Sequence, residues 1–140
     1  MNVFLLNETI KHSKLSGIST HSLAISDKEG ESLFNLDTIT SATGTLEVNQ
    51  KSWTEKYLNY KPEKTFVHCT CLDTLKSVLT PPGIIKIDVE GHEAAVFRGA
   101  QSTIEHNFPA LIVESFPPER AKILSMCQKM GYQTFDAETL

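Results

Sequence analysis

Carboxylate side chains follow two apolar segments of the chain, and their type and position suit them to chemistry. Asp88 and Glu90 come at the end of the run Ile84-Ile85-Lys86-Ile87, and Glu114 directly follows Leu111-Ile112-Val113. Strands of a parallel sheet are buried on both faces and are usually apolar throughout, and burying an unpaired carboxylate is costly. Ligands of open α/β sheets bind at the carboxyl ends of the strands. If the two strands are neighbours, we expect these carboxylates to converge on one solvated crevice.

Several kinds of chemistry fit such a crevice. A carboxylate there can accept a proton from a hydroxyl group or hold a cationic ligand. Alternatively, Asp88, Glu90 and Glu114 could supply oxygen ligands to a divalent ion such as Mg²⁺. In a purely structural interpretation, Lys86 pairs with one carboxylate and solvent covers the others. His92 is a further candidate base, although a histidine that opens a helix is more often a solvated helix end.

The segment His68-Cys69-Thr70-Cys71 resembles a metal site only at first sight. Strand alternation places both cysteines on one face and His68 on the other, so one tetrahedral ion could not easily bind all three. Structural zinc sites prefer a C-x₂-C spacing with a second pair of ligands, and no such pair follows. We therefore predict two small core cysteines and no metal site.

The hydrophobic pattern predicts the elements that would position the carboxylates. In the second half, strands over 84–89 and 110–116 alternate with helices over 92–106 and 119–130, and a last strand spans 132–135. Gly91 allows a tight turn from strand to helix. The first half suggests a helix over 3–15, a strand over 18–26, a second hairpin arm over 32–36, a strand over 65–71 and a short helix over 72–79. Such alternation predicts an α/β domain with a largely parallel sheet.

Residues 37–62 have no clear periodicity. Thr, Ser, Asn and Lys dominate this stretch, although Leu46 and Val48 could form a short strand. Irregular segments of this length inside a compact domain are commonly surface excursions, and long loops are often functional. We expect an excursion on the surface, with a lid over a ligand site as the functional alternative.

Size and composition limit the class of protein. The chain has 140 residues, 40% of them hydrophobic, and a net charge of −4, which fits one globular domain. The acidic balance argues against nucleic acid or an anionic membrane as partner. The apolar run over 3–6 is too short for a signal peptide, and no run approaches a membrane helix. Three cysteines, an odd number, predict no disulfide framework and favour a cytoplasmic location.

The central segment resembles the signature of the FkbM methyltransferase family. The run from Lys86 to Glu93, followed by Val96, Gly99 and Ala100, is similar to the pattern I-K-x-D-V-E-G-x-E-x-x-V-x-x-G-A. Flanking segments agree in order and spacing. They are Asn7, which lies in the expected first helix; Ala24-Ile25-Ser26-Asp27 with Gly30, similar to A-x-S-D-x-x-G; Cys71-Leu72-Asp73-Thr74-Leu75, similar to T-L-D-x-L with cysteine replacing threonine; and Ile112-Val113-Glu114, similar to I-x-V-E. The resemblance covers one domain over 1–140 and is clearest over 7–135.

This resemblance implies a Rossmann-like class I methyltransferase sheet with flanking helices and S-adenosylmethionine as cofactor. The methyl group would pass to an oxygen of a small-molecule or glycan acceptor. By the same resemblance, Ser26 and Asp27 would lie near the adenine. Asp88 and Glu90 would face the methionine part of the cofactor and the acceptor, and Glu114 would also bind the cofactor. Asp88, Glu90 and His92 would be the candidate catalytic residues.

The glycine-rich loop that grips the cofactor in such folds is not found in the sequence. The glycines before the signature are Gly17, Gly30, Gly44 and Gly83, and no two of them are close together. We therefore expect that the first βαβ unit is missing and that the sheet is partial. Its remaining strands would have an exposed apolar edge. We expect either that the sequence is a partial one or that a protein partner covers this edge, and an inactive methyltransferase-like module that acts by protein binding is the alternative function.

Overall fold

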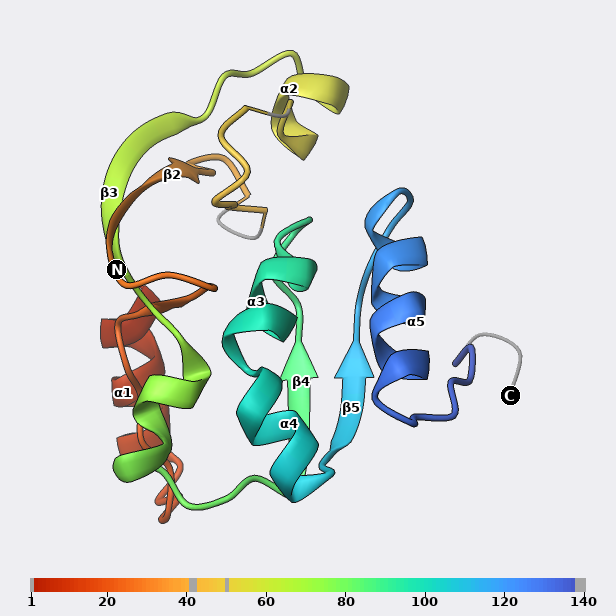
Figure 1. The fold of residues 1–140 in the computed structure, drawn as a ribbon. Helices are drawn as coiled ribbons and strands as arrows, with labels where there is room; N and C mark the ends of the chain where they lie inside the picture. The colour runs from red at the N-terminus through yellow and green to blue at the C-terminus, as the bar shows by residue number, and fades with distance from the viewer. Residues whose placement is uncertain (1, 41–42, 50, 138–140) are drawn as a thin grey trace.

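The computed structural model of the chain describes residues 2–40, 43–49 and 51–137. Its strands form one sheet of three strands and another of two (Figure 1). The elements, in chain order, are α1 (Asn2–His12), β1 (Ala24–Ile25), β2 (Gly30–Leu36), α2 (Trp53–Tyr57), β3 (Glu63–Thr70), the 3₁₀ helix η1 (Leu72–Ser77), β4 (Ile84–Ile87), α3 (Glu93–Gly99), α4 (Gln101–Asn107), β5 (Ala110–Val113) and α5 (Glu119–Lys129). None of the helices in these ranges has the length and hydropathy of a membrane-spanning segment.

The first sheet has the strand order β1-β3-β2. β2 runs antiparallel to β3 from the pair Gly30↔Cys69 to the pair Leu36↔Glu63, whereas β1 is parallel to β3 and only two residues long. The hairpin expected between residues 18–26 and 32–36 was therefore wrong, since β3 lies between these strands. The seven-residue register with β3 gives β2 far more backbone hydrogen bonds than the short β1 could offer.

The second sheet consists of β4 and β5, which pair in parallel from Ile84↔Ala110 to Ile87↔Val113. Figure 1 shows the two arrows pointing the same way, with α5 alongside β5 and the curved β2–β3 pair on the other side of α3. The buried core lies between this sheet and its helices and is built from Ile87, Ala94, Val96, Phe97, Ala100, Ile104, Ile123 and Cys127. The sequence thus correctly predicted the strand–helix–strand–helix order of the second half and its parallel sheet.

The helix expected over 92–106 is broken into α3 and α4 at Ala100, where φ is −114° and ψ is 5°. The carboxylate of Asp73, on η1, accepts the backbone N–H groups of Ser102 at 2.9 Å and Thr103 at 2.7 Å. A side chain far away in sequence therefore caps the start of α4, as an N-cap residue does locally. The hydrophobic periodicity does not reveal the break, because the apolar residues of both helices continue a single stripe.

The strand expected over 132–135 is also wrong, because these residues have no strand structure. The chain there is held by side chains. The Tyr132 hydroxyl donates to the Pro109 carbonyl at 2.9 Å, and the Tyr132 ring stacks on Phe108 with centroids 5.2 Å apart. An aromatic contact of this kind replaces the ladder that the apolar pattern suggested.

Candidate functional site

The carboxyl ends of β4 and β5 lie side by side. The Glu114 N–H donates to the Ile87 carbonyl at 3.0 Å, so the neighbouring strands that the sequence analysis required are present. Burial raises the pKa of Glu90, and the charges of Asp88, Glu114 and Glu93 raise it further. These carboxylates are therefore close enough to influence one another electrostatically.

Lys86 is the cation of this acidic cluster. Its Nζ lies 2.6 Å from Asp88 Oδ2, in an ion pair that is partly open to solvent. The hydrogen bond from Lys86 to Asp88 raises the pKa of the lysine, with further contributions from the charges of Asp88 and Glu114. The pairing that the structural interpretation expected for Lys86 is thus present, while the acidic excess around Glu90 remains.

The turn that follows β4 is built from two left-handed residues, with φ of 51° at Glu90 and 94° at Gly91. The Gly91 N–H donates to Glu93 Oε1 at 2.9 Å. Glu93 is 2% exposed, and its second oxygen, Oε2, is buried without a hydrogen-bond partner among the described residues. A buried carboxylate oxygen without a partner is costly, so this oxygen is a natural acceptor for a donor group on a ligand.

A chain of hydrogen bonds crosses the site through His92. The Nδ1 atom of His92 lies 2.7 Å from Glu47 Oε1, and its Nε2 atom lies 2.9 Å from Ser26 Oγ. Ser26 is fully buried, and the His92 side chain is only 11% exposed. His92 is therefore not a solvated helix end, because both of its ring nitrogens have protein partners.

Asp27 is held at the end of β1 by Arg98 of α3, whose Nε lies 2.8 Å from Asp27 Oδ2. The hydrogen bond from Arg98 lowers the pKa of Asp27, against a smaller opposing effect of burial. Gly99, the next residue of α3, lies against the backbone of Ser26, since an added Cβ would stand 1.9 Å from the Ser26 carbonyl oxygen. Ser26 and Asp27 are thus brought up to the β4–α3 turn by close packing of α3.

A cavity of about 900 Å³ lies against the first sheet and extends to the turn after β4. Its walls come from four parts of the chain: the start of α1, β1 with the residues before it, strands β2 and β3 with the segment after β2, and the turn after β4. Residues that line it include His21, Phe34, Leu46, Asp88, Val89 and His92. Of the sequence-predicted carboxylates, Asp88 therefore lines this cavity directly.

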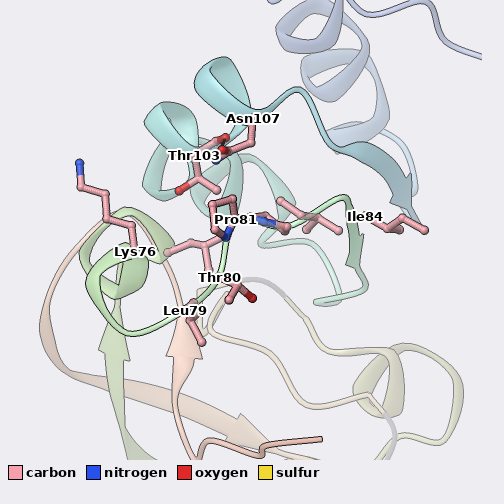
Figure 2. A pocket seen from close by; sticks show the side chains of 10 residues that line it. Lys76, Leu79, Thr80, Pro81, Ile84, Thr103 and Asn107 are labelled. Carbon is pink, nitrogen blue, oxygen red and sulfur yellow. Dashed lines mark hydrogen bonds between the residues drawn. The ribbon is translucent and has the colours of Figure 1, made fainter. Parts of the chain in front are cut away.

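A smaller, mostly apolar pocket of about 200 Å³ lies at the amino end of β4. Figure 2 shows its walls, with Thr103 and Asn107 on one side and Leu79, Thr80 and Pro81 on another. It is at the end of β4 away from Asp88, so it is not part of the acidic site.

The segment 37–62 reaches this site, which the sequence alone could only suggest. The Thr45 hydroxyl donates to the Glu90 carbonyl at 2.8 Å, and Thr45 and Asn35 exchange backbone hydrogen bonds of 2.9 and 3.1 Å. A single bridge at Thr45 takes the place of the strand expected around Leu46 and Val48. Sequence reasoning missed Glu47 as a partner of His92, because an aperiodic stretch gives no signal for which side chain points inward.

Asp37 anchors the start of this segment. Burial opposes ionisation of its carboxyl group, but hydrogen bonds from Thr40, Thr43 and Ile39 outweigh that effect and lower the pKa of Asp37 well below its usual range. The bonds from the Thr40 and Ile39 N–H groups are both 2.9 Å long. The segment therefore begins with a turn closed around an ionised carboxylate.

We predict that Asp37→Asn destabilises the protein at neutral pH and that this loss shrinks in acid. A lowered pKa in the folded state gives stability that is fully present above the unfolded value of about 3.9 and is lost as the pH falls through the folded value. The free energies of unfolding of both proteins, measured by urea titration from pH 7 downwards, should converge below pH ~4. A constant difference across that range would contradict the prediction.

The three free cysteines, Cys69, Cys71 and Cys127, do not form a site with His68. Cys69 is fully buried, as expected of a core cysteine. Cys71 is half-buried, and burial together with the nearby Glu29 raises the pKa of its thiol. Among the described residues, no group of three or more His, Cys, Asp or Glu side chains is arranged to hold a metal ion.

Comparison with known families identifies one match. Residues 5–134 match the family model of the methyltransferase FkbM domain. No curated protein and no solved structure matches the chain significantly. The family match covers both sheets and the acidic turn after β4.

Proposed function

Because the chain belongs to the FkbM methyltransferase family, we propose that it acts in the transfer of a methyl group from S-adenosylmethionine to an oxygen of a small-molecule or glycan acceptor. The observation that carries this proposal is the acidic turn after β4, where Asp88 lines a cavity of about 900 Å³. S-adenosylmethionine supplies an electrophilic methyl group when it is bound. The protein then has to bind the cofactor and the acceptor, align them with each other and accept one proton.

The cationic part of the cofactor would be held by the carboxylates around this turn. Asp88 faces the cavity, and Glu93 has a buried oxygen without a partner in the described part of the chain. A bound ammonium group would satisfy that oxygen and would remove the cost of leaving it unpaired. Glu114 adds negative charge beside them. These carboxylates therefore favour an amino-acid-like cationic ligand, which would share Asp88 with Lys86.

Glu90 is our proposed proton acceptor. A general base works best when its pKa is near the working pH, and burial together with Asp88 and Glu114 raises the pKa of Glu90 from its ordinary value. His92 is less suited to this role, because Glu47 and Ser26 occupy both of its ring nitrogens. We therefore propose that His92 orients neighbouring groups and that Glu90 receives the proton of the acceptor hydroxyl.

The proposed nucleotide side of the site centres on Asp27. Its carboxylate is ionised and partly exposed beside Arg98, so it can accept a hydrogen bond from an adenine amino group. Ser26 has a buried hydroxyl that already bonds His92. Ser26 would therefore fix the position of the end of β1, and it would not bond the nucleotide directly.

Protein binding is a second candidate function, and the outer edge of β4 favours it. In the part of the chain that the structure describes, β4 pairs with β5 alone, and Ile84 at its start is 66% exposed. An open edge of this kind accepts another strand. A polypeptide segment that adds strands there would extend the two-stranded sheet towards the larger Rossmann-like sheet that the family resemblance implies.

Cofactor binding tests the first proposal. Isothermal calorimetry with S-adenosylmethionine at high micromolar concentration should give heat for the wild-type chain. Glu93→Gln and Asp88→Asn should each weaken binding by roughly 10- to 100-fold, since each removes a charged hydrogen-bond partner worth about 1.5–3 kcal/mol. Glu31→Gln, a change at an exposed position of β2, is the matched control and should bind like the wild type.

The absence of binding heat for the wild-type chain would contradict the claim that this polypeptide is itself a methyltransferase. In that event, protein binding at the edge of β4 would be the better explanation of the function of the chain. Binding that both carboxylate variants retain would leave the cofactor proposal but would move its cationic subsite away from the turn after β4.

A further inference from the structure

We propose that Glu47 is a positioning residue of this site, whose carboxylate fixes the His92 ring and so clamps residues 43–49 over the carboxyl end of β4. This inference rests on the proposed function for its meaning, because the clamped residues form one wall of the cavity that would receive the ligands. The clamp itself consists of hydrogen bonds between described residues. It can therefore be tested without cofactor or acceptor.

The hydrogen-bond chemistry selects one form of the His92 ring. An ionised carboxylate can only accept hydrogen bonds, so the 2.7 Å contact with Glu47 Oε1 places the proton on Nδ1 of His92. In the neutral ring, Nε2 is then an acceptor for the Ser26 hydroxyl at 2.9 Å, a shorter contact than the 3.4 Å between that hydroxyl and its other acceptor, Asp27 Oδ1. Glu47 thus determines which ring nitrogen of His92 carries the proton, much as an outer carboxylate orients a histidine that binds a metal.

The same segment is attached at a second point beside the first. Thr45 donates to the Glu90 carbonyl at 2.8 Å, and its hydroxyl also accepts the Glu47 N–H at 3.1 Å. Glu47 Cγ would lie 3.9 Å from a Cβ added at Gly91, so the Glu47 side chain passes directly over the turn. Two contacts on consecutive parts of the turn hold the segment more firmly than either could alone.

The position of the clamp explains its use. Gly44, Thr45 and Leu46 line the cavity of about 900 Å³ together with Asp88 and His92. With the clamp formed, these residues cover one side of the turn, while Asp88 stays partly open to solvent. A wall that is already fixed in place lowers the cost of ordering the site when a ligand binds.

Two readouts on the full chain test the clamp. The first is the pair of ¹⁵N shifts of the His92 ring, assigned through their loss in His92→Gln. The wild type should show the Nδ1–H tautomer, and Glu47→Ala should show a mixture of tautomers. The second is amide hydrogen exchange of the peptide that contains residues 43–49, which should be roughly tenfold faster in Glu47→Ala, equivalent to about 1.4 kcal/mol of local stability.

Conservative and remote variants complete the design. Glu47→Gln keeps a carbonyl oxygen that can accept from Nδ1–H, so it should restore most of the wild-type tautomer and exchange rate. Glu63→Ala, at an exposed position where β3 begins, should match the wild type in both readouts. Circular dichroism of each variant establishes that it is folded before either measurement.

Wild-type ring shifts and exchange rates in Glu47→Ala would overturn the proposal. A change in only one of the two readouts would overturn it as well, since the proposal requires the ring and the segment to respond together. Failure of S-adenosylmethionine to bind the wild-type chain would remove the proposed function but would leave both readouts as they are. The two failures are therefore distinguishable.

Discussion

Gly99→Ala should destabilise the protein by about 3 kcal/mol, because the added methyl group has no space. Its Cβ would lie 1.9 Å from the Ser26 carbonyl oxygen and 2.8 Å from the Ser26 carbonyl carbon. Both atoms are backbone, so α3 and the end of β1 would have to move apart. Overpacking of this kind typically costs 1–3 kcal/mol and more where backbone must shift. Alanine is otherwise the better helix former by about 1 kcal/mol, so a loss of stability would be attributable to the contact.

Thermal unfolding followed by circular dichroism measures this effect. At ~3 °C per kcal/mol for a domain of this size, the melting temperature should fall by about 10 °C. Gly83→Ala is the matched control, since a Cβ at Gly83 meets nothing within 4 Å and should leave the melting temperature near that of the wild type. Equal melting temperatures for Gly99→Ala and the wild type would show that α3 does not rest on Ser26.

The contact also explains part of the sequence signature in physical terms. Ser26 belongs to one short motif and Gly99 to another, 73 positions later. Only a residue without a side chain allows the two backbones to touch, and this approach carries Asp27 to Arg98. The pairing of the motifs was visible in the sequence as a family resemblance, while its cause became visible only in three dimensions.

The sequence predicted those parts of the fold that depend on local periodicity. The apolar runs ending at Ile87 and Val113 are strands, and they pair in parallel, because continuous hydrophobicity between turn residues suits a buried strand. The partner of β2 could not be read in the same way. Its choice of β3 over β1 depends on the length of the ladder available to it, which is a property of two distant segments.

The residues of the candidate site also differ in how far the local sequence predicts them. Asp88, Glu90 and Glu114 were identified from the sequence because carboxylates at strand ends violate the apolar pattern. His92 was identified as a candidate base that opens a helix, but its two hydrogen-bond partners lie 45 and 66 positions away and could not be predicted. Glu47 had no local signal, since polar residues are ordinary in an irregular segment. The side chains that position a site are therefore harder to predict than the carboxylates that give it its negative charge.

Asp73→Ala should cost roughly 2–4 kcal/mol, because one carboxylate stabilises the start of α4 from another element. Its Oδ1 accepts the N–H and the hydroxyl of Thr103, both at 2.7 Å, and its Oδ2 accepts the Ser102 N–H at 2.9 Å. Loss of an N-cap costs about 0.5–2 kcal/mol, and hydrogen bonds to a charged group contribute about 1.5–3 kcal/mol. Thr103 is buried, so water would not readily replace the lost partner.

Urea unfolding of Asp73→Ala, Asp73→Asn and Ser77→Ala would separate the capping role from a general effect of changing η1. Asparagine keeps one oxygen for the backbone donors and should fall between alanine and the wild type. Ser77 lies at the exposed end of η1, so its truncation should change the free energy of unfolding by less than ~0.5 kcal/mol. If Asp73→Ala were as stable as Ser77→Ala, the break between α3 and α4 would have to arise from the residues around Ala100 themselves. The cap from η1 would then be a consequence of the break and not its cause.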